Sequence, residues 1–315
     1  MKSSASVAKD GSGYWLAVTE REVMEKRVGV IGLGIMGGAI ASNLHDRGWA
    51  VTGYDVDSAK CAEMAAIGIG IASGPAGVVQ STEAIITSLP SASALLSVAD
   101  QLASAPPAGR IVIEASTMAP ADKLRFAEIL TAAGHVPLDC PLSGTGAQAK
   151  VRDLVVFASG DSAAIKTVTP IFADFAKQSA DLGAYGNGSR LKFVANLLVA
   201  IHNVASAEAM VLAMKAGLDL KQVVELIGTG AGSSRIFQLR APMMAEDHYE
   251  PATMRIATWK KDMSVIADFA EGLGVETPLF SATAPLYDEA IDMGLGDQDT
   301  AAVCKIIEMM SGITR

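Results

Sequence analysis

Short β-rich runs alternate with helical stretches from Lys26 to about Gly188, and this alternation limits the possible folds more than any other feature of the sequence. Ala- and Leu-rich segments that fit amphipathic helices separate most of the runs. Strands and helices in this order predict βαβ units, and therefore a doubly wound parallel sheet with helices on both faces. The candidate strands are Arg27–Ile31, Ala50–Tyr54, Ala84–Leu89, Arg110–Glu114, His135–Cys140 and Leu154–Ser159.

Beyond Gly188 the β signal ends and four or more helical stretches follow. The first is a long candidate helix from about Ser189 to Ala216, which closes at Gly217, a residue type suited to a helix C-terminus. We therefore predict an α/β domain over residues 24–188 and an all-α domain over residues 189–315, linked by the long helix. Residues 1–23 are polar and punctuated by Gly and Ser, and we expect a disordered extension or an upstream start codon there.

Composition narrows the classes of protein that remain. The 315 residues are 50% hydrophobic and 19% charged, which excludes intrinsic disorder. The net charge of −9 and the absence of a basic run argue against a nucleic-acid partner. Cys61, Cys140 and Cys304 are far apart and lack ligand spacing, so we expect no disulfide framework, no metal site and a cytoplasmic location.

The most apolar stretch, residues 193–214, contains Asn196, His202, Asn203 and Glu208. A membrane-spanning helix rarely carries so many polar groups. We therefore predict a buried helix and no membrane partner.

A glycine-rich turn follows the first candidate strand directly. Gly32, Gly34 and Gly37 form a Gly-x-Gly-x-x-Gly pattern that opens a helical run, with Ile35 and Met36 between the second and third glycines. In a dinucleotide-binding turn the first glycine allows the tight bend, the second lets the pyrophosphate approach the backbone, and the third lets helix and strand pack closely. The strand before the turn and the helix after it predict a Rossmann-type domain in which these residues bind a dinucleotide.

Asp55 closes the second candidate strand, 23 positions after Gly32, where a carboxylate accepts hydrogen bonds from the adenosine ribose. A carboxylate repels the additional phosphate of NADP, and the next three residues offer no arginine to hold it. The sequence therefore favours NAD over NADP as the cofactor. The neighbouring Asp57 is the better candidate for a simple helix cap.

The long candidate helix begins with an informative pair. Lys192 and Asn196 are spaced i, i+4 and share one face of the helix. A lysine at the start of an apolar helix either extends to solvent or acts as a proton donor at a domain junction, and the residues alone leave both open. The segments Ser116–Thr117 and Ser143–Gly146 follow strand C-termini, where α/β sheets bind ligands, and the second could form a carboxylate nest.

Together these segments resemble the β-hydroxyacid dehydrogenase family, which includes 3-hydroxyisobutyrate dehydrogenase and tartronate semialdehyde reductase. The resemblance extends from Lys26 to Gly312 in family-like order and spacing. It rests on GLGIMG (32–37), SLPSAS (88–93), EASTMAP (114–120), DCPLSGTGAQA (139–149), GNGSRLKFVANLL (186–198) and WKKDM (259–263).

The resemblance implies reversible hydride transfer between a nicotinamide cofactor and a small β-hydroxy acid or its semialdehyde. It makes Lys192 the catalytic general acid/base and Asn196 a substrate contact. It also implies substrate-carboxylate binding by Ser143, Gly144 and Thr145. The remaining implied contacts are to the cofactor, from Leu89, Pro90, Thr117 and Lys261, whereas Asp262 is expected to fix its helix.

Two departures from the family bear on the substrate. Many members have a second glycine at the position of Thr145 and a glycine-containing turn at residues 150–153. Lys150 and Arg152 could recognise a second anionic group, although a solvated turn is the simpler interpretation. The substrate itself stays open among 3-hydroxyisobutyrate, tartronate semialdehyde or glycerate, succinic semialdehyde or 4-hydroxybutyrate, threonate-type sugar acids and sulfonated analogues.

Three other functions remain to be weighed. Imine reductases resemble this family in fold but commonly lack the lysine at position 192, and they use NADPH, which Asp55 disfavours. The 6-phosphogluconate dehydrogenases need a longer helical domain than 315 residues allow. A catalytically silent NAD-binding regulator would not need the Lys192/Asn196 pair. The family further implies a homodimer or a homotetramer.

Overall fold

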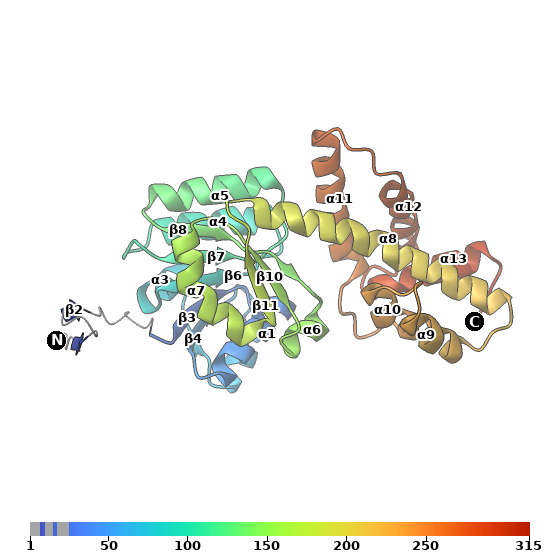
Figure 1. The fold of residues 1–315 in the computed structure, drawn as a ribbon, viewed down its shortest axis with the longest axis horizontal. Helices are drawn as coiled ribbons and strands as arrows, with labels where there is room; N and C mark the ends of the chain where they lie inside the picture. The colour runs from blue at the N-terminus through green and yellow to red at the C-terminus, as the bar shows by residue number, and fades with distance from the viewer. Residues whose placement is uncertain (1–6, 10–14, 18–24) are drawn as a thin grey trace.

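The computed structural model describes residues 7–9, 15–17 and 25–315. Two short strands, β1 (Val7–Lys9) and β2 (Trp15–Ala17), pair antiparallel within the segment for which a disordered extension was expected. The rest of that segment lies outside the described residues. The remainder of the chain forms an α/β part and a helical part, joined by one long helix (Figure 1).

The centre of the α/β part is a six-stranded parallel sheet with the strand order β5-β4-β3-β6-β7-β8. From β3 the chain winds outward in one direction through β4 and β5, and from β6 it winds outward in the other. This order confirms the doubly wound prediction and makes the β3/β6 boundary the switch point at which such sheets bind ligands. The strands are β3 (Arg27–Ile31), β4 (Ala50–Tyr54), β5 (Gly70–Ile71), β6 (Ala84–Thr87), β7 (Ile111–Glu114) and β8 (Val136–Asp139).

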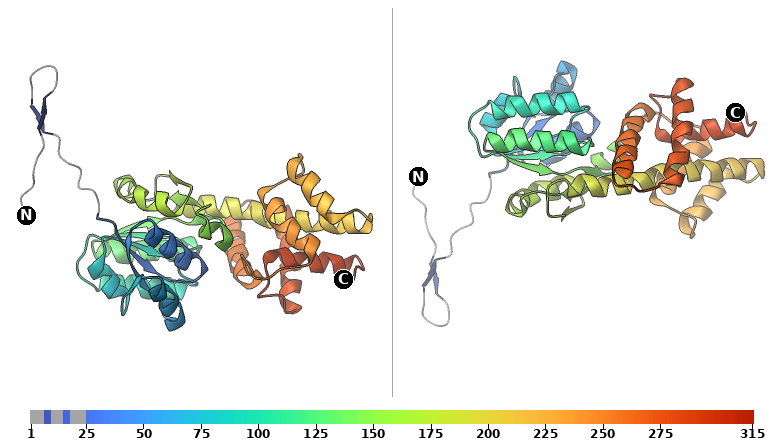
Figure 2. Two further views of the ribbon diagram at one scale, coloured as in Figure 1. Left: turned by 90° about the horizontal axis from the view of Figure 1, so that it is seen from below. Right: turned by 90° about the horizontal axis from the view of Figure 1, so that it is seen from above.

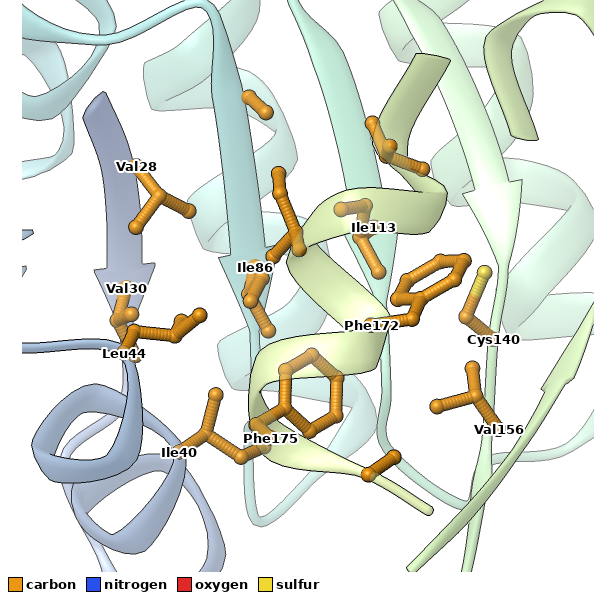
Figure 3. Packing of buried hydrophobic residues seen from close by; sticks show 14 of the residues in the cluster. Val28, Val30, Ile40, Leu44, Ile86, Ile113, Cys140, Val156, Phe172 and Phe175 are labelled. Carbon is orange, nitrogen blue, oxygen red and sulfur yellow. The ribbon is translucent and has the colours of Figure 1, made fainter. Parts of the chain in front are cut away.

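Both faces of this sheet are covered, because neighbouring strand residues point into different cores. On β6, Ile86 packs with Phe172 and Phe175 under α1 and α7 (Figure 3), whereas Ile85 packs with Phe126 under α3, α4 and α5. Two-sided burial explains why the strands read as continuous apolar runs. The helices are α1 (Ile35–Asp46), α2 (Ser58–Ala66), α3 (Pro75–Ser81), α4 (Ala92–Ala103), α5 (Pro120–Ala132) and α7 (Ser162–Phe175).

A second, three-stranded sheet contains the last predicted strand. β10 (Val155–Ala158) pairs antiparallel with β9 (Leu142–Ser143) and parallel with β11 (Gln178–Asp181), and the short helix α6 (Gly146–Lys150) connects β9 to β10. The expectation of one parallel sheet is therefore wrong for this strand. The chain leaves the main sheet after Asp139, which forms an antiparallel bridge with Ser159.

The helical part is built around α8 (Asn187–Lys215), which runs from the α/β part to the far end of the molecule (Figures 1 and 2). Gly186 (φ +92°) precedes this helix and Gly217 (φ +71°) follows it. Both adopt the left-handed conformation that glycine tolerates best, so the helix ends where the sequence places its glycines. The helices packed around it are α9 (Leu220–Thr229), α10 (Arg235–Glu246), α11 (Ile256–Gly272), α12 (Pro278–Asp292) and α13 (Val303–Met310), with a 3₁₀ turn at Thr300–Ala302.

By length and composition α8 could cross a membrane, but 44% of its most apolar window is buried within the molecule. Phe193, Ala200, Val204, Ala207 and Met210 form part of the core of the helical part. One face of α8 thus belongs to the core, as the sequence predicts, whereas other apolar side chains of the helix stay exposed.

Candidate active site

Of the three glycines in the turn between β3 and α1, one has free space around it and two have none. A Cβ at Gly32 would collide with the carbonyl oxygen of Ser88, and one at Gly37 would collide with the carbonyl oxygen of Gly32. A Cβ at Gly34 would meet nothing within 4 Å. Gly34 also caps α1, with no side chain bonded to the first-turn N–H groups. An open backbone at a helix N-terminus fits the pyrophosphate of a dinucleotide.

Asp55, directly after β4, holds this turn in place. One carboxylate oxygen (Oδ2) accepts the Leu33 N–H at 2.7 Å, and the other (Oδ1) accepts the Asp57 N–H at 2.8 Å. Asp57 itself caps α2 by accepting the Ala59 N–H at 2.9 Å. Asp57 is thus the helix cap, and Asp55 stays half-exposed beside the turn.

A cavity of about 440 Å³ lies where the two parts of the molecule meet. Several predicted site residues share its wall, drawn from six segments that are distant in the sequence. They are Met36, Leu89, Pro90, Thr117, Gly144, Lys192 and Lys261. Of the other predicted residues, Gly32, Gly34, Ile35, Gly37 and Asp55 lie in or beside the glycine-rich turn and the start of α1. Ser143 and Thr145 flank Gly144, and Asn196 lies one turn after Lys192 on α8.

Lys192 is the one residue predicted to touch substrate or cofactor that has both burial and a shifted pKa. It lies in the second turn of α8 and is 8% exposed. Burial lowers its pKa to about 8, because an ammonium loses hydration there, and the Asp262 carboxylate offsets part of the effect. A lysine in this state can hold or release a proton near neutral pH. Asn196 lies one turn further along α8 and is buried.

Lys261 and Asp262 come from α11 and reach the cavity from the helical part. The Lys261 ammonium donates to the Thr117 carbonyl oxygen at 2.7 Å and lies 3.2 Å from the Asp262 carboxylate. Burial raises the pKa of Asp262, while Lys261 and Lys192 lower it in part. Asp262, expected only to fix its helix, therefore also lines the cavity and acts electrostatically on Lys192.

The predicted carboxylate-binding segment is only partly open. Gly144 has φ +137° and lines the cavity, and a Cβ there would meet Leu154. The backbone N–H of Thr145 instead donates to the Gln148 side chain at 3.0 Å, where Thr145 caps α6. The Thr145 N–H is thus used by the local helix, whereas Gly144 lines the cavity.

The turn after α6 contains the second departure from the family's sequence pattern. Arg152 has φ +59°, a conformation that favours glycine, at a place where family members have a glycine-containing turn. The next residue, Asp153, pairs with Lys177 at 2.5 Å and with Arg235 of the helical part at 3.3 Å. Hydrogen bonds from Lys177 and Gln148 lower its pKa to about 2. This turn thus contacts the helical part through Asp153, and the solvated role of Lys150 and Arg152 stays a prediction.

Several cavity residues were not identified from the sequence. They are Ser88, Ala115, Leu142, Met254, Ala257 and Thr258. Ala257 and Thr258 precede Lys261 and Asp262 by four positions on α11, so helical periodicity from the WKKDM motif could have located them. Ser88, Ala115 and Leu142 each lie beside a predicted residue.

Comparison with known proteins agrees with this geometry. Residues 27–185 match the model of the NAD-binding domain of 6-phosphogluconate dehydrogenase, and residues 186–307 match the NAD-binding model of NADP-dependent 3-hydroxyisobutyrate dehydrogenase. Glyoxylate/succinic semialdehyde reductase 1 of Arabidopsis thaliana is 30% identical over 89% of this chain and 98% of its own length. The L-threonate dehydrogenase of Escherichia coli O6:H1 is 31% identical over 92% and 96%.

Among solved structures, a 3-hydroxyisobutyrate dehydrogenase from Salmonella typhimurium superimposes with a TM-score of 0.81 at 30% identity, covering 89% of this chain and 99% of that one. A two-part, dinucleotide-binding oxidoreductase is the class that the fold and the site define. The chain belongs to the β-hydroxyacid dehydrogenase family, whose members depend on NAD(P). This confirms the family resemblance drawn from the motifs.

Proposed function

We propose that this NAD(P)-dependent oxidoreductase converts a small β-hydroxy acid and its semialdehyde into one another, with NAD as the preferred cofactor and Lys192 as general acid/base. The observation that carries the proposal is the buried Lys192 on the wall of a cavity that also contains Leu89 and Thr117. Its pKa of about 8 suits proton exchange with a hydroxyl group near neutral pH.

Proton transfer is the task of the chain itself, since the bound nicotinamide supplies only the hydride chemistry. On oxidation, neutral Lys192 Nζ takes the hydroxyl proton, and on reduction the ammonium returns a proton to the carbonyl oxygen. The ammonium also stabilises negative charge that develops on that oxygen. Because Lys192 is 8% exposed, little water competes for this proton.

Gly144 and Ser143 are proposed to bind the substrate carboxylate, with Thr145 as their helix-side neighbour and Asn196 as a further polar contact. Gly144 leaves its backbone open toward the cavity, which is how a short segment can accept a carboxylate without side-chain obstruction. The cavity of about 440 Å³ must hold the nicotinamide end of the cofactor as well, which favours a short-chain acid. Fixing the carboxylate orients the carbinol carbon for hydride transfer.

Asp55 supports the preference for NAD. Its carboxylate lies beside the glycine-rich turn, where it can accept hydrogen bonds from ribose hydroxyls and would repel an added phosphate. We expect kcat/KM to be higher with NAD than with NADP, and Asp55→Asn to narrow the ratio by about tenfold, because about 1.4 kcal/mol of repulsion is removed. A preference for NADP in the unmodified enzyme would contradict this.

The experiment that tests the function follows NADH absorbance with 3-hydroxyisobutyrate, glycerate, 4-hydroxybutyrate and threonate. The matching oxidised acids, which are semialdehydes for the first three and a keto acid for threonate, are tested in the reverse direction. Turnover on at least one pair is expected, and Lys192→Ala is expected to raise the barrier by about 2–5 kcal/mol. Lys215→Ala, an exposed change on the same helix, is the matched control. No turnover on any acid, with tight NAD binding intact, would contradict the proposal and direct the search to imine substrates.

We also propose that the chain assembles as a homodimer or a homotetramer, and that it works in the cytoplasm. Large exposed apolar side chains on α8 and α9 support self-association, with Leu198, Leu212 and Leu226 exposed by 48%, 71% and 70%. The three unpaired cysteines suit a reducing compartment. Sedimentation of the purified protein as a monomer at micromolar concentration would contradict the assembly.

A further inference from the structure

Three charged side chains are buried together behind the cavity wall, at the carboxyl edge of the main sheet. Lys123 is 1% exposed, and Glu114 and Asp139 are 0% exposed. The Lys123 ammonium pairs with Glu114 and, at 2.9 Å, with Asp139. Removing charges from water is costly, and an apolar cluster of similar volume would stabilise the fold equally well. Stability alone therefore does not account for this buried ion network.

The two carboxylates occupy matching positions on neighbouring strands. Glu114 is the last residue of β7 and Asp139 the last residue of β8, and the two are partners in the parallel register. Lys123 comes from α5 and reaches both. Each carboxylate also accepts hydrogen bonds from outside the network, and these bonds lead to two different walls of the cavity.

The bonds made by Glu114 lead to the wall assigned to the cofactor. Its Oε1 accepts the Ser116 N–H at 2.9 Å, and the Ser116 hydroxyl oxygen accepts the Leu89 N–H at 2.8 Å. Ser116, Leu89 and the neighbouring Thr117 all line the cavity. Glu114 thus fixes two loops that are 27 residues apart in the chain.

The bonds made by Asp139 lead to the helix that carries Lys192. Its Oδ2 accepts the Ser189 N–H and its Oδ1 accepts the Ser189 hydroxyl proton, both at 2.8 Å. Ser189 lies in the first turn of α8, three positions before Lys192. The helix start packs so closely against the sheet edge that a Cβ on Gly188 would collide with the carbonyl oxygens of Phe157 and Asp139.

We propose that Glu114, Lys123, Asp139 and Ser189 are positioning residues that hold the start of α8, and with it Lys192, at a fixed place relative to the cofactor loops. The proposal rests on the function proposed above and adds the means by which its proton donor is placed. Lys123 is the common point, because among the described residues it alone pairs with the carboxylate of each branch. The network touches neither substrate nor cofactor and acts through Ser116 and Ser189.

The decisive variant is Ser189→Ala, which removes one hydroxyl and leaves the backbone N–H bond to Asp139 in place. Ser206→Ala is the matched control, since Ser206 is a buried serine on the same helix whose hydroxyl bonds only the local His202 carbonyl oxygen. Asp139→Asn is a stronger change of the same kind. If Asp139→Asn fails to fold, Ser189→Ala still tests the proposal.

The first readout is the pH dependence with which Lys192 reacts with acetic anhydride, measured by mass spectrometry of the full-length protein. A loosened helix start admits water to Lys192, so in Ser189→Ala the titration midpoint is expected to rise by about 0.5 pH unit or more. The midpoint is expected to be unchanged in Ser206→Ala. Equal midpoints in Ser189→Ala and the unmodified protein would overturn the proposal, whatever happens to the melting temperature.

The second readout is steady-state kinetics with the hydroxy acid that the unmodified enzyme oxidises. We expect kcat to fall by about tenfold in Ser189→Ala, with the Kd for NAD within about twofold, because the misplaced group is the proton acceptor. A loss of NAD binding with unchanged kcat would overturn the proposal. Absence of turnover in the unmodified enzyme would overturn the proposed function instead, and the Lys192 titration would still test the positioning.

Discussion

Lys123 in the buried ion network and Lys192 on the cavity wall are both removed from solvent, yet their pKa values move in opposite directions. Burial by itself lowers the pKa of both. For Lys123 the adjacent Asp139 and Glu114 more than offset this effect, so its pKa lies above the ordinary value. Lys192 has only the more distant Asp262 and falls to about 8.

The contrast shows that burial alone does not make a lysine reactive. A buried lysine with two carboxylate partners stays charged at every physiological pH and serves structure. One that faces a cavity with a single weak partner can exchange its proton. The two regions are joined through Asp139 and Ser189, so the permanently charged lysine helps to place the titrating one.

The largest expected effect is on stability at the ion network. Lys123→Met leaves two buried carboxylates without their partner and is expected to lower the free energy of unfolding by about 3–5 kcal/mol. Urea denaturation followed by circular dichroism measures it, with the exposed Lys166→Met on α7 as control. If Lys123→Met lowers the free energy of unfolding no more than Lys166→Met does, the ion network contributes nothing to stability. The contrast between the two buried lysines would then fail.

A substitution of Lys192 on the cavity wall is expected to change stability in the opposite direction. The pKa of Lys192 is about 8 in the folded chain and near 10.5 when unfolded, so the folded state carries a penalty below pH 8 that fades as the pH rises toward 10.5. Lys192→Met removes it and is expected to raise the free energy of unfolding at pH 7 by about 1–3 kcal/mol. Denaturation at pH 7 and pH 10, compared with Lys215→Met, tests this. Destabilisation by Lys192→Met would contradict the account.

A smaller effect is expected when the weak partner of Lys192 is removed. The Asp262 carboxylate raises the pKa of Lys192, so Asp262→Asn is expected to lower it further, by up to about one pH unit. The low-pH limb of kcat/KM for oxidation would then move to lower pH. A shift to higher pH would show that Asp262 acts on Lys192 other than as a nearby negative charge.

The smallest effect is expected at Lys261, a half-exposed lysine on the same cavity. Its hydrogen bond to the Thr117 carbonyl joins the two parts of the molecule, and its charge is screened by solvent. Lys261→Met is expected to raise the KM for NAD by about fivefold, equivalent to about 1 kcal/mol, with a smaller change in kcat. If kcat falls as much in Lys261→Met as in Lys192→Ala, the assignment of proton transfer to Lys192 is contradicted.

Much of the fold and of the candidate site could be predicted because it depends on local pattern. The strand–glycine–helix turn at Gly32 and the end of the long helix at Gly217 are each determined by residues that are consecutive in the sequence. The motif around Lys192 likewise places that side chain on a buried helix at the junction. In the structure, the cavity collects the predicted Leu89, Thr117 and Lys192 from separate segments.

What could not be predicted depends on contacts between distant residues. Lys123 reads as an ordinary surface lysine of an amphipathic helix, and only folding brings it to Asp139, 16 positions away. The second role of Asp262 arises from the packing of α11 against α8. The sequence placed β10 in the main sheet because its partner β9 has only two residues and is too short to be recognised.

The measurement that tests the central claim most directly is the pH profile of kcat/KM for hydroxy-acid oxidation between about pH 6 and pH 10, since kcat/KM reports groups of the free enzyme. The account predicts a rise with a midpoint near 8, the pKa of Lys192, and a residual rate in Lys192→Met that lacks this limb. A flat profile, or the same limb persisting in Lys192→Met, would contradict the assignment of Lys192 as the proton-transfer group.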